Sequence, residues 1–404
     1  MPGNEINGFF LLSFRKARVR FSMETVQPIL KRGREVWDRI NMPEMEYRQR
    51  ILRIQETMKK EKMDVLLVYG AGLNGYGNAA YLSNYATKMP WGAFVIVPRE
   101  GDVTLLFQGG SRELKAVQRI TWIEDIRSSM NPTQTCLEQM KEKNFISSRV
   151  GIAGPRRLMP VHEFQTLLNG MSRWEVIEAD NILNDMRMIK SPKECDQMRR
   201  ASRIVAQGFD FITDSPFNSP TERNLDALID REMRLEGVED VRLLFGKPKE
   251  ASWAMRPAED LKLTDGDTLI IYLSVSFERY WAEGIRTYIF KDSRFTTPSV
   301  DKGMALYDKV ISEMKPEKTV SAYHKDVQSV FKNSGLESIP DYGYGQGIGL
   351  DLHEPPTINN SDQTRMKQGM CFAIRLASKH KKIGGFMTGD TLLLTENVPE
   401  KLTV

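Results

Sequence analysis

The feature that most constrains the fold is an alternation of short apolar runs and helical segments between residues 64 and 169. The runs are rich in β-branched, aromatic and leucine residues and are bounded by Gly, Pro, Asn or Asp, as strands usually are. Such an alternation predicts an open α/β domain over about residues 45–180. The strands are expected at 64–70, 81–85, 92–98, 103–107 and 150–153, and the helices at 111–118, 132–142 and 160–169.

A second domain is expected to begin near Ser191. Ser191 is a suitable N-cap, Pro192 fits the first helical position, and Glu194 completes a capping box. This helix start follows directly on the α/β segment, so the boundary between the domains is placed just before it. The chain is therefore divided into an N-terminal extension (1–44), an α/β domain (45–185) and a C-terminal domain (186–404).

The N-terminal extension is expected to carry no function. Its apolar stretch, 9–14, precedes the basic residues of 15–20, whereas a secretory signal has its charges first. Met23 is an alternative start, and residues 24–62 are expected to be helical with a break at Pro43. No apolar run approaches the roughly 18 residues of a membrane span, so no membrane segment is predicted.

Charge and cysteine content narrow the function classes. The net charge is only +4, with basic and acidic residues interspersed, which argues against nucleic acid as a partner. The hydrophobic fraction of 41% and the charged fraction of 27% are ordinary for a globular protein. Cys136, Cys195 and Cys371 show no paired spacing, so we expect buried thiols and a reducing cytoplasmic location.

The segment Gly345–Pro356 reads G-Q-G-I-G-L-D-L-H-E-P-P. It resembles the signature of the creatinase/prolidase/aminopeptidase ("pita-bread") family, G-H-G-I-G-L-x-x-H-E-x-P. The strand order of the α/β domain and the Ile-Lys-Ser-Pro-Lys-Glu entry to the next domain are also similar, from about residue 45 to the end. The resemblance implies a creatinase-like N-terminal α/β domain, a C-terminal pita-bread domain of curved antiparallel sheet flanked by helices, and a homodimer.

The chain departs from this family at its metal site. Relatives hold two metal ions with two Asp, one His and two Glu. The matching positions here are Tyr272, Glu283, Gln346, Arg375 and Gly389, and Ala254 replaces a further family His. An amide is a poor ligand for transition metals, and a guanidinium has no lone pair to donate. The resemblance therefore implies a metal-free member, and no metal or other cofactor is expected.

The remaining polar residues form a chemically capable set. The resemblance implies that His353 faces the substrate, as general acid/base, with Glu283 as its catalytic partner. Alternatively, His353 is an ordinary loop residue, and Glu283 pairs with Arg375 to fill a vacated metal site. The residues predicted to bind substrate are Tyr272, Arg375, Gln346, Glu354 and Trp91. The alternatives are that Tyr272 fills space and that Trp91 packs in the core. His162, His324 and His380 are expected at the surface.

The expected function is that of a metal-independent, creatinase-like hydrolase, not a peptidase, which cleaves a C–N bond of a small zwitterionic or anionic molecule. The alternatives are a catalytically inactive relative that binds peptide or a small ligand, and a lyase. The expected partners are the small-molecule substrate and a second copy of the chain. As in creatinase-like dimers, the segments 74–78 and 85–91 are expected to reach the partner's pocket.

Overall fold

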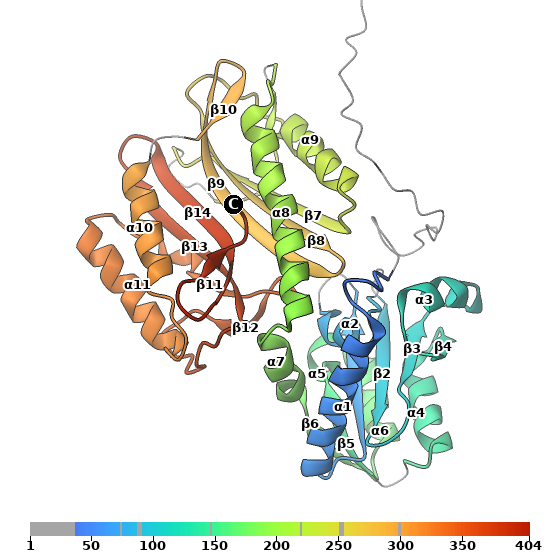
Figure 1. Cartoon of the computed structure of the whole chain (residues 1–404). Helices are drawn as coiled ribbons and strands as arrows, with labels where there is room; N and C mark the ends of the chain where they lie inside the picture. The colour runs from blue at the N-terminus through green and yellow to red at the C-terminus, as the bar shows by residue number, and fades with distance from the viewer. Residues whose placement is uncertain are drawn as a thin grey trace, which may run out of the picture.

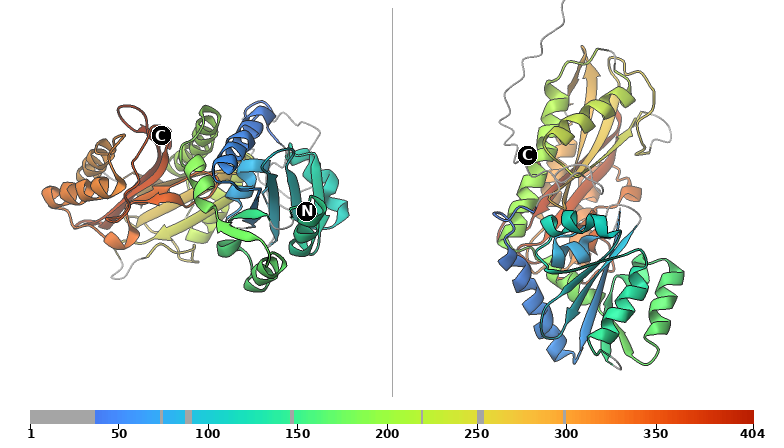
Figure 2. Two further views of the ribbon diagram at one scale, coloured as in Figure 1. Left: turned by 90° about the horizontal axis from the view of Figure 1, so that it is seen from below. Right: turned by 90° about the vertical axis from the view of Figure 1, so that its right-hand side faces the viewer.

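The computed structural model describes residues 37–72, 75–86, 91–145, 148–218, 220–249, 254–297 and 300–404. Met23 and most of the predicted extension lie outside the described residues, as do Asn74 and positions 87–90 of the predicted dimer segments. Two bodies lie side by side, one built on each of two sheets (Figures 1 and 2).

The first body is the α/β domain that the sequence predicts. Its six-stranded sheet has the order β4-β3-β2-β1-β5-β6. Both faces of the central strand β1 are buried, since Leu66 and Val68 belong to one apolar cluster and Leu67 to another. The strands are β1 (Val65–Ala71), β2 (Gly92–Pro98), β3 (Thr104–Gln108), β4 (Asp125–Ser129), β5 (Arg149–Ala153) and β6 (Glu175–Glu178). The helices are α1 (Glu44–Lys60), α2 (Gly77–Ser83), η1 (Ser111–Glu113), α3 (Leu114–Ile120), α4 (Pro132–Glu142), α5 (Pro155–Leu158), α6 (Val161–Gly170) and α7 (Asp180–Met188).

One predicted strand of this domain is wrong. The stretch 81–85 ends helix α2, and Asn84 closes that helix in the left-handed conformation with φ of 60°. All seven residues of α2 are buried, so the stretch carries no polar face whose period would separate helix from strand. The other predicted strands and helices of this domain coincide with β1, β2, β3, β5, α3, α4 and α6.

The second body is a nine-stranded sheet. Seven strands follow the order β12-β11-β13-β14-β9-β8-β7, β10 pairs with β9, and β15 pairs with β14, all of them antiparallel. Helices α8 and α9 lie beside β7–β9, and α10 and α11 lie beside β13 and β14 (Figure 1). The strands are β7 (Asp240–Gly246), β8 (Thr268–Phe277), β9 (Tyr280–Lys291), β10 (Arg294–Thr296), β11 (Gly345–Gly347), β12 (Glu354–Thr357), β13 (Cys371–His380), β14 (Gly384–Leu393) and β15 (Glu400–Lys401). The helices are α8 (Pro192–Asp214), α9 (Glu222–Leu235), α10 (Asp301–Ser312), α11 (Val320–Ser334) and the short η2 (Pro340–Tyr342).

The helix that opens this domain begins where the sequence predicts. Ser191 Oγ accepts from the Glu194 backbone N–H at 3.2 Å, and the Ser191 N–H donates to Glu194 Oε2 at 3.1 Å, so the capping box is confirmed. The prediction of an α/β domain followed by a domain of antiparallel sheet flanked by helices is confirmed as well.

A buried ion network joins the two bodies. Arg187, at the end of α7, donates to Asp351 at 2.7 Å and to Glu354, while Lys190 donates to Glu354 at 3.0 Å. Asp351 in turn accepts from the Gly77 N–H at 3.2 Å. The charges of Arg187 and Lys190 overcome burial and lower the pKa of Glu354 to about 2. This network holds the signature loop against the α/β domain.

Two further sequence predictions concern the cysteines and membrane segments. Cys136, Cys195 and Cys371 are free and buried, as predicted. No helix in the described part of the chain is long and apolar enough to cross a bilayer. The cytoplasmic location stays a prediction.

Candidate active site

Four of the predicted site residues lie on one face of the second sheet because of the strand register. A row here is a set of residues paired across neighbouring strands. Tyr272 on β8 and Arg375 on β13 belong to one row, and the residues between them are Ile285 on β9 and Gly389 on β14. Glu283 on β9 and Gln346 on β11 belong to the adjacent row, through Ala373 and Thr391. Residues paired across strands point to the same side of a sheet. The four side chains therefore converge from four strands.

A chain of hydrogen bonds connects these four side chains. Tyr272 Oη donates to Glu283 Oε2 at 2.8 Å, and Arg375 Nη2 donates to Glu283 Oε1 at 3.1 Å. Arg375 Nη2 also donates to Gln346 Oε1 at 2.5 Å. Burial and the adjacent Glu283 carboxylate raise the pKa of Tyr272 well above its ordinary value, so the phenol keeps its proton. Of the two alternatives for Glu283 and Arg375, the structure shows the pair facing each other.

Two N–H donors of this cluster are left over. Arg375 Nε and Gln346 Nε2 are both buried, and neither has a hydrogen-bond partner among the residues that the structure describes. The Gln346 amide cannot simply be turned round, because a guanidinium offers only donors and the Gln346 oxygen must face it. A buried donor without a partner costs about 1–3 kcal/mol. A buried donor of this kind suits the oxygen of a bound carbonyl or carboxylate group.

The residues present do not fit the two metal ions that the sequence analysis attributes to relatives with this fold. The remaining carboxylate, Glu283, already accepts from Tyr272 and Arg375, and a permanent cation would lie beside any bound metal. Gly389, at another ligand position, has no side chain. Within the described ranges no group of three His, Cys, Asp or Glu side chains could hold a metal ion.

His353 lines a cavity of about 430 Å³ between the two bodies. Burial lowers the pKa of His353 below its ordinary 6.5; the charge of Glu283 opposes this shift, and those of Arg375 and Arg242 add to it. His353 is therefore neutral at pH 7 and lies within electrostatic reach of the hydrogen-bonded cluster. The cavity is lined by Gly75, Tyr76, Arg157, Leu158, Arg242, Trp281, Asp351, Leu352 and His353.

Sequence reasoning missed several of these lining residues. Trp281 could have been found from the sequence. Successive side chains of a strand point to opposite faces, so residues two apart, such as Trp281 and Glu283 on β9, share one face. Arg242 lies in register with Ser274, which pairs with Glu283, so it belongs to the same row. No local pattern marks Arg157, whose helix α5 has only four residues.

The remaining predicted residues lie elsewhere. Both oxygens of Glu354 are engaged by Arg187 and Lys190, so the structure places Glu354 in the ion network between the bodies. Trp91 precedes β2, its carbonyl accepts from the Gly72 N–H at 3.0 Å, and it is not among the described residues that line the cavity. Substrate binding by Glu354 and Trp91 stays a prediction.

The histidines predicted at the surface divide into two groups. His162 is exposed, as predicted, whereas His324 and His380 are partly buried. The His324 ring lies 5.3 Å from the Tyr344 ring, centroid to centroid, so burial in an aromatic contact accounts for its position.

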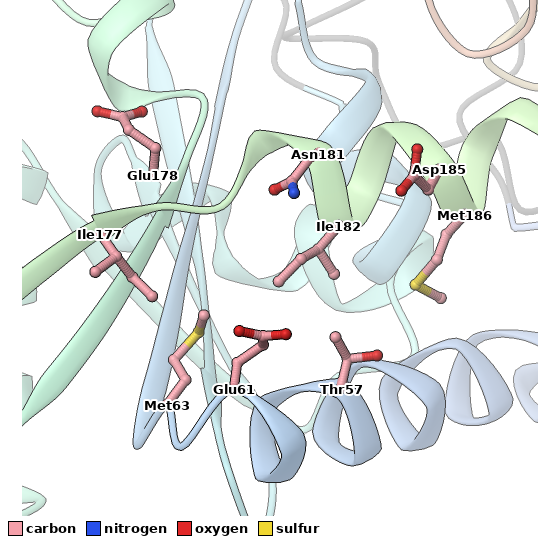
Figure 3. Close-up of a pocket in the computed structure, with 9 residues that line it drawn as sticks. All are labelled: Thr57, Glu61, Met63, Ile177, Glu178, Asn181, Ile182, Asp185 and Met186. Atoms are coloured by element: carbon pink, nitrogen blue, oxygen red, sulfur yellow. The ribbon is translucent and has the colours of Figure 1, made fainter. Parts of the chain in front are cut away.

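A second cavity, of about 360 Å³, lies between α1, β6 and α7 (Figure 3). Its lining combines carboxylates such as Glu61 and Asp185 with apolar side chains such as Ile177 and Met186, and includes none of the predicted site residues. Because His353 is among its lining residues, the cavity between the two bodies is the candidate active site.

Comparison with known proteins identifies both bodies. The Creatinase/Prolidase N-terminal domain family matches residues 50–189, and Metallopeptidase family M24 matches residues 196–396. The Xaa-Pro dipeptidase of Pyrococcus horikoshii is 23% identical over 372 residues, which cover 88% of this chain and 97% of that protein. The Xaa-Pro dipeptidase of Pyrococcus furiosus is 24% identical over 299 residues, covering 70% of this chain and 83% of that protein.

Solved structures show the same fold. The prolidase from Pyrococcus horikoshii matches with a TM-score of 0.70 at 21% identity, over 88% of this chain and 98% of that chain. The X-Pro aminopeptidase from Thermotoga maritima matches with a TM-score of 0.72 at 18% identity, over 88% and 97%.

These comparisons correct the function expected from the sequence. The relatives are named as Xaa-Pro dipeptidases and prolidases, which are peptidases. The expectation of a metal-independent, creatinase-like hydrolase of a small non-peptide molecule is therefore wrong, and so are its alternatives of an inactive binder and a lyase. That expectation interpreted the altered metal-ligand positions as a sign of a different substrate class. The names of the relatives do not support this interpretation.

Proposed function

Since the chain consists of a Creatinase/Prolidase N-terminal domain and a Metallopeptidase family M24 domain, we propose that it hydrolyses short peptides of the Xaa-Pro type. The observation that carries this proposal is the pair of unpartnered buried donors, Arg375 Nε and Gln346 Nε2, within electrostatic reach of a neutral His353. Peptide hydrolysis needs both parts, a base for water and donors for the developing oxyanion.

The proposed reaction needs two proton transfers. His353 takes a proton from a water molecule while the water oxygen bonds to the peptide carbonyl carbon. The carbonyl oxygen becomes negative and is held by Arg375 Nε–H and Gln346 Nε2–H. When the C–N bond breaks, His353 returns the proton to the leaving nitrogen, so that one peptide and one water give two products.

The cluster around Arg375 fits this role. Arg375 Nη2 donates to both Glu283 Oε1 and Gln346 Oε1, at 3.1 and 2.5 Å, so that the guanidinium is fixed before substrate arrives. Tyr272 holds Glu283 from the other side at 2.8 Å. Preorganised donors stabilise a transition state without reorganising during the reaction. Because the residues present do not fit the family's metal ions, the proposed reaction has no step that uses one.

The first test is release of proline from Gly-Pro and Leu-Pro by the purified protein. His353→Gln is expected to lower kcat by about 10²- to 10⁴-fold. Gln346→Leu is expected to lower kcat by about 10²- to 10³-fold while KM changes little, because the lost donor acts on the oxyanion.

Gln197→Leu is the matched control for the loss of a buried amide. Gln197 on α8 is fully buried, and its oxygen accepts from Arg200 at 3.1 Å. Its Nε2 likewise has no partner in the described part of the chain, and Gln197 does not line the cavity. Its substitution is expected to leave kcat unchanged. The proposal fails if neither dipeptide is cleaved, or if His353→Gln and Gln346→Leu keep the wild-type rate. A homodimer, expected from the family resemblance, stays part of the proposal.

A further inference from the structure

Two neighbouring hollows of the C-terminal domain are lined largely by lysines. One, of about 770 Å³, lies between the β13–β14 hairpin and the end of α11, and the other, of about 390 Å³, lies between α10 and α11. Lys302 lines both, so they form one groove, which we call the lysine groove. Figures 1 and 2 show α10 and α11 at the end of this domain that lies away from the α/β domain. The lysines of the groove are Lys302, Lys309, Lys379, Lys381 and Lys382.

Packing and backbone hydrogen bonds fix the shape of the lysine groove. Ile383, in the hairpin turn, is buried in the same apolar cluster as Leu306 of α10 and Phe386 of β14. The Lys379 N–H donates to the Glu337 carbonyl at 2.9 Å, which attaches the hairpin to the segment that follows α11. The walls of the groove are therefore in place before a ligand arrives, which lowers the entropic cost of binding.

Most of these lysines have no carboxylate partner. Glu337, the one carboxylate among the described lining residues, pairs with Lys379. The other four lysines have no carboxylate within 4 Å in the part of the chain that the structure describes, namely Lys302, Lys309, Lys381 and Lys382. Asp308 of α10 pairs outside the groove, with Lys401 at 2.7 Å. A concave surface with charge of one sign concentrates its field on a ligand of opposite charge.

The lysine groove also has an apolar floor. Leu306 is buried, and Val330 and Leu336 are half-buried, and all three line the groove. Lysine is a hydrated point charge on a flexible stem, so it accepts carboxylates in many geometries. A ligand that combines carboxylates with apolar side chains can therefore contact both the lysines and the floor.

The lining residues discriminate between classes of anionic partner. None of the described lining residues is Phe, Tyr or Trp, the aromatic side chains on which unpaired bases stack. A membrane surface binds proteins that expose apolar side chains for insertion, whereas here Leu306 is buried and Leu336 is half-buried at the floor. An extended acidic peptide, with its side chains spread along a groove, fits both features.

We propose that the lysine groove binds an acidic, extended segment of a partner protein. The carboxylates of this segment pair with the lysines, and its apolar side chains contact Leu306 and Leu336. The proposal goes beyond the proposed hydrolysis and does not depend on it, because no described residue lines both the groove and the cavity next to His353. Exposed ion pairs are individually weak and are screened by salt, so the affinity is expected to be modest and salt-dependent.

The test measures the fluorescence anisotropy of a fluorescein-labelled peptide of three Glu-Leu-Glu-Gly repeats, which contains no proline for the proposed hydrolysis to act on. Wild-type protein is expected to bind it with a Kd of roughly 1–100 μM at low salt. Raising NaCl from about 0.05 M to about 0.5 M is expected to weaken binding about tenfold or more. Replacing each Leu of the peptide by Ser is expected to weaken binding about threefold or more, because the floor loses its apolar partner.

Charge reversal in the hairpin turn locates the binding site. The double variant Lys381→Glu, Lys382→Glu is expected to weaken binding about 30-fold or more, because two attractions become repulsions. Both side chains are exposed, so the variant is expected to fold. Lys302→Glu changes a different wall and is expected to weaken binding about fivefold or more, so the test does not depend on one variant.

Lys60→Glu, Lys62→Glu is the matched control, with the same change in net charge. Lys60 ends α1 and Lys62 follows it in the α/β domain, and both are exposed. Neither has a carboxylate within 4 Å among the described residues, and neither lines the groove. The control is expected to keep the wild-type affinity within about twofold, because the field of two distant exposed charges is screened.

The proposal is overturned if wild-type protein does not bind the peptide at about 1 mM, or if the groove variants bind it as well as the control does. It is also overturned if an oligothymidylate of equal charge, or vesicles containing phosphatidylserine, bind to the groove more tightly than the peptide. Proline release from Gly-Pro by the hairpin variant at the wild-type rate, with peptide binding lost, is the expected result. If the wild type releases no proline but binds the peptide through the groove, the hydrolysis fails and the groove stands.

Discussion

Arg375 and Glu283 lie 92 residues apart in the chain, and Arg375 Nη2 meets Glu283 Oε1 at 3.1 Å across three neighbouring strands of the second sheet. The pair occupies the position at which the family's signature residues hold metal ions. A positive side chain therefore lies where this fold otherwise supplies ligands to a cation, and the local hydrogen bonds are arranged around it.

Removal of Arg375 is expected to destabilise the protein. Arg375→Met leaves the buried Glu283 carboxylate with Tyr272 but without its cation, and breaking a buried pair costs about 3 kcal/mol. The double variant Arg375→Met, Glu283→Gln is expected to regain part of this loss. Denaturant unfolding of the wild type, the single variant and the double variant measures the free energy of unfolding. A loss under about 1 kcal/mol in the single variant would show that the pair contributes no more than a surface pair.

Divalent metal ions are expected to leave the melting temperature unchanged. A ligand that binds only the folded protein raises Tm by mass action, and the residues around Glu283 offer a metal ion no adequate set of donors. Thermal melting with and without Mn²⁺, Co²⁺ and Zn²⁺ makes the comparison. A rise in Tm for the wild type that disappears in Glu283→Gln would identify Glu283 as a ligand and contradict the expectation.

The activity is expected to fall on the acid side at a pH below 6.5. Burial lowers the pKa of His353 from 6.5, and the base must be unprotonated, so activity is lost as the pH falls through the lowered value. Folding favours the neutral form of His353, so stability also falls with the pH. This loss begins below the ordinary pKa of 6.5 and is complete below the lowered pKa of the folded protein. The chain has four histidines, and NMR titration with His353→Gln as the assignment variant measures this pKa directly.

Acid is expected to weaken the network between the two bodies. The pKa of Glu354 is lowered from 4.5 to about 2 by Arg187 and Lys190. A carboxyl with a lowered folded pKa contributes stability above its unfolded pKa, and this contribution is lost as the pH falls from about 4.5 toward 2. Glu354→Gln is expected to cost about 3 kcal/mol at neutral pH, because two buried cations lose their partner.

Unfolding midpoints at neutral pH and at about pH 3 test this prediction, the lower pH lying between the folded and unfolded pKa values. The control is Glu100→Gln, because Glu100 forms an exposed pair with Lys59 and such pairs contribute little. The control is expected to keep the acid dependence of the wild type, whereas Glu354→Gln is expected to lose part of it. Equal acid dependence in all three proteins would contradict the assigned role of Glu354.

Local sequence patterns predicted the elements whose structure depends on nearby residues. The capping box at Ser191 needs only residues three positions apart, and the strands of the α/β domain carry their own apolar runs and turn residues. The stretch 81–85 failed because an entirely buried segment shows no period, so the surrounding packing decides between helix and strand.

The sequence by itself determined the fold and the chemical identity of the altered cluster, because signature spacing places Tyr272, Glu283, Gln346 and Arg375 at known positions of that fold. Only the tertiary structure decided their partners. Strand register brings Arg375 onto Glu283 and leaves two donors unpaired, and it aligns Arg242 with the same row. Docking of the two bodies adds Arg157 to the cavity and engages Glu354 in an ion network. These contacts join residues far apart in the chain, and their energies depend on burial that no local pattern encodes.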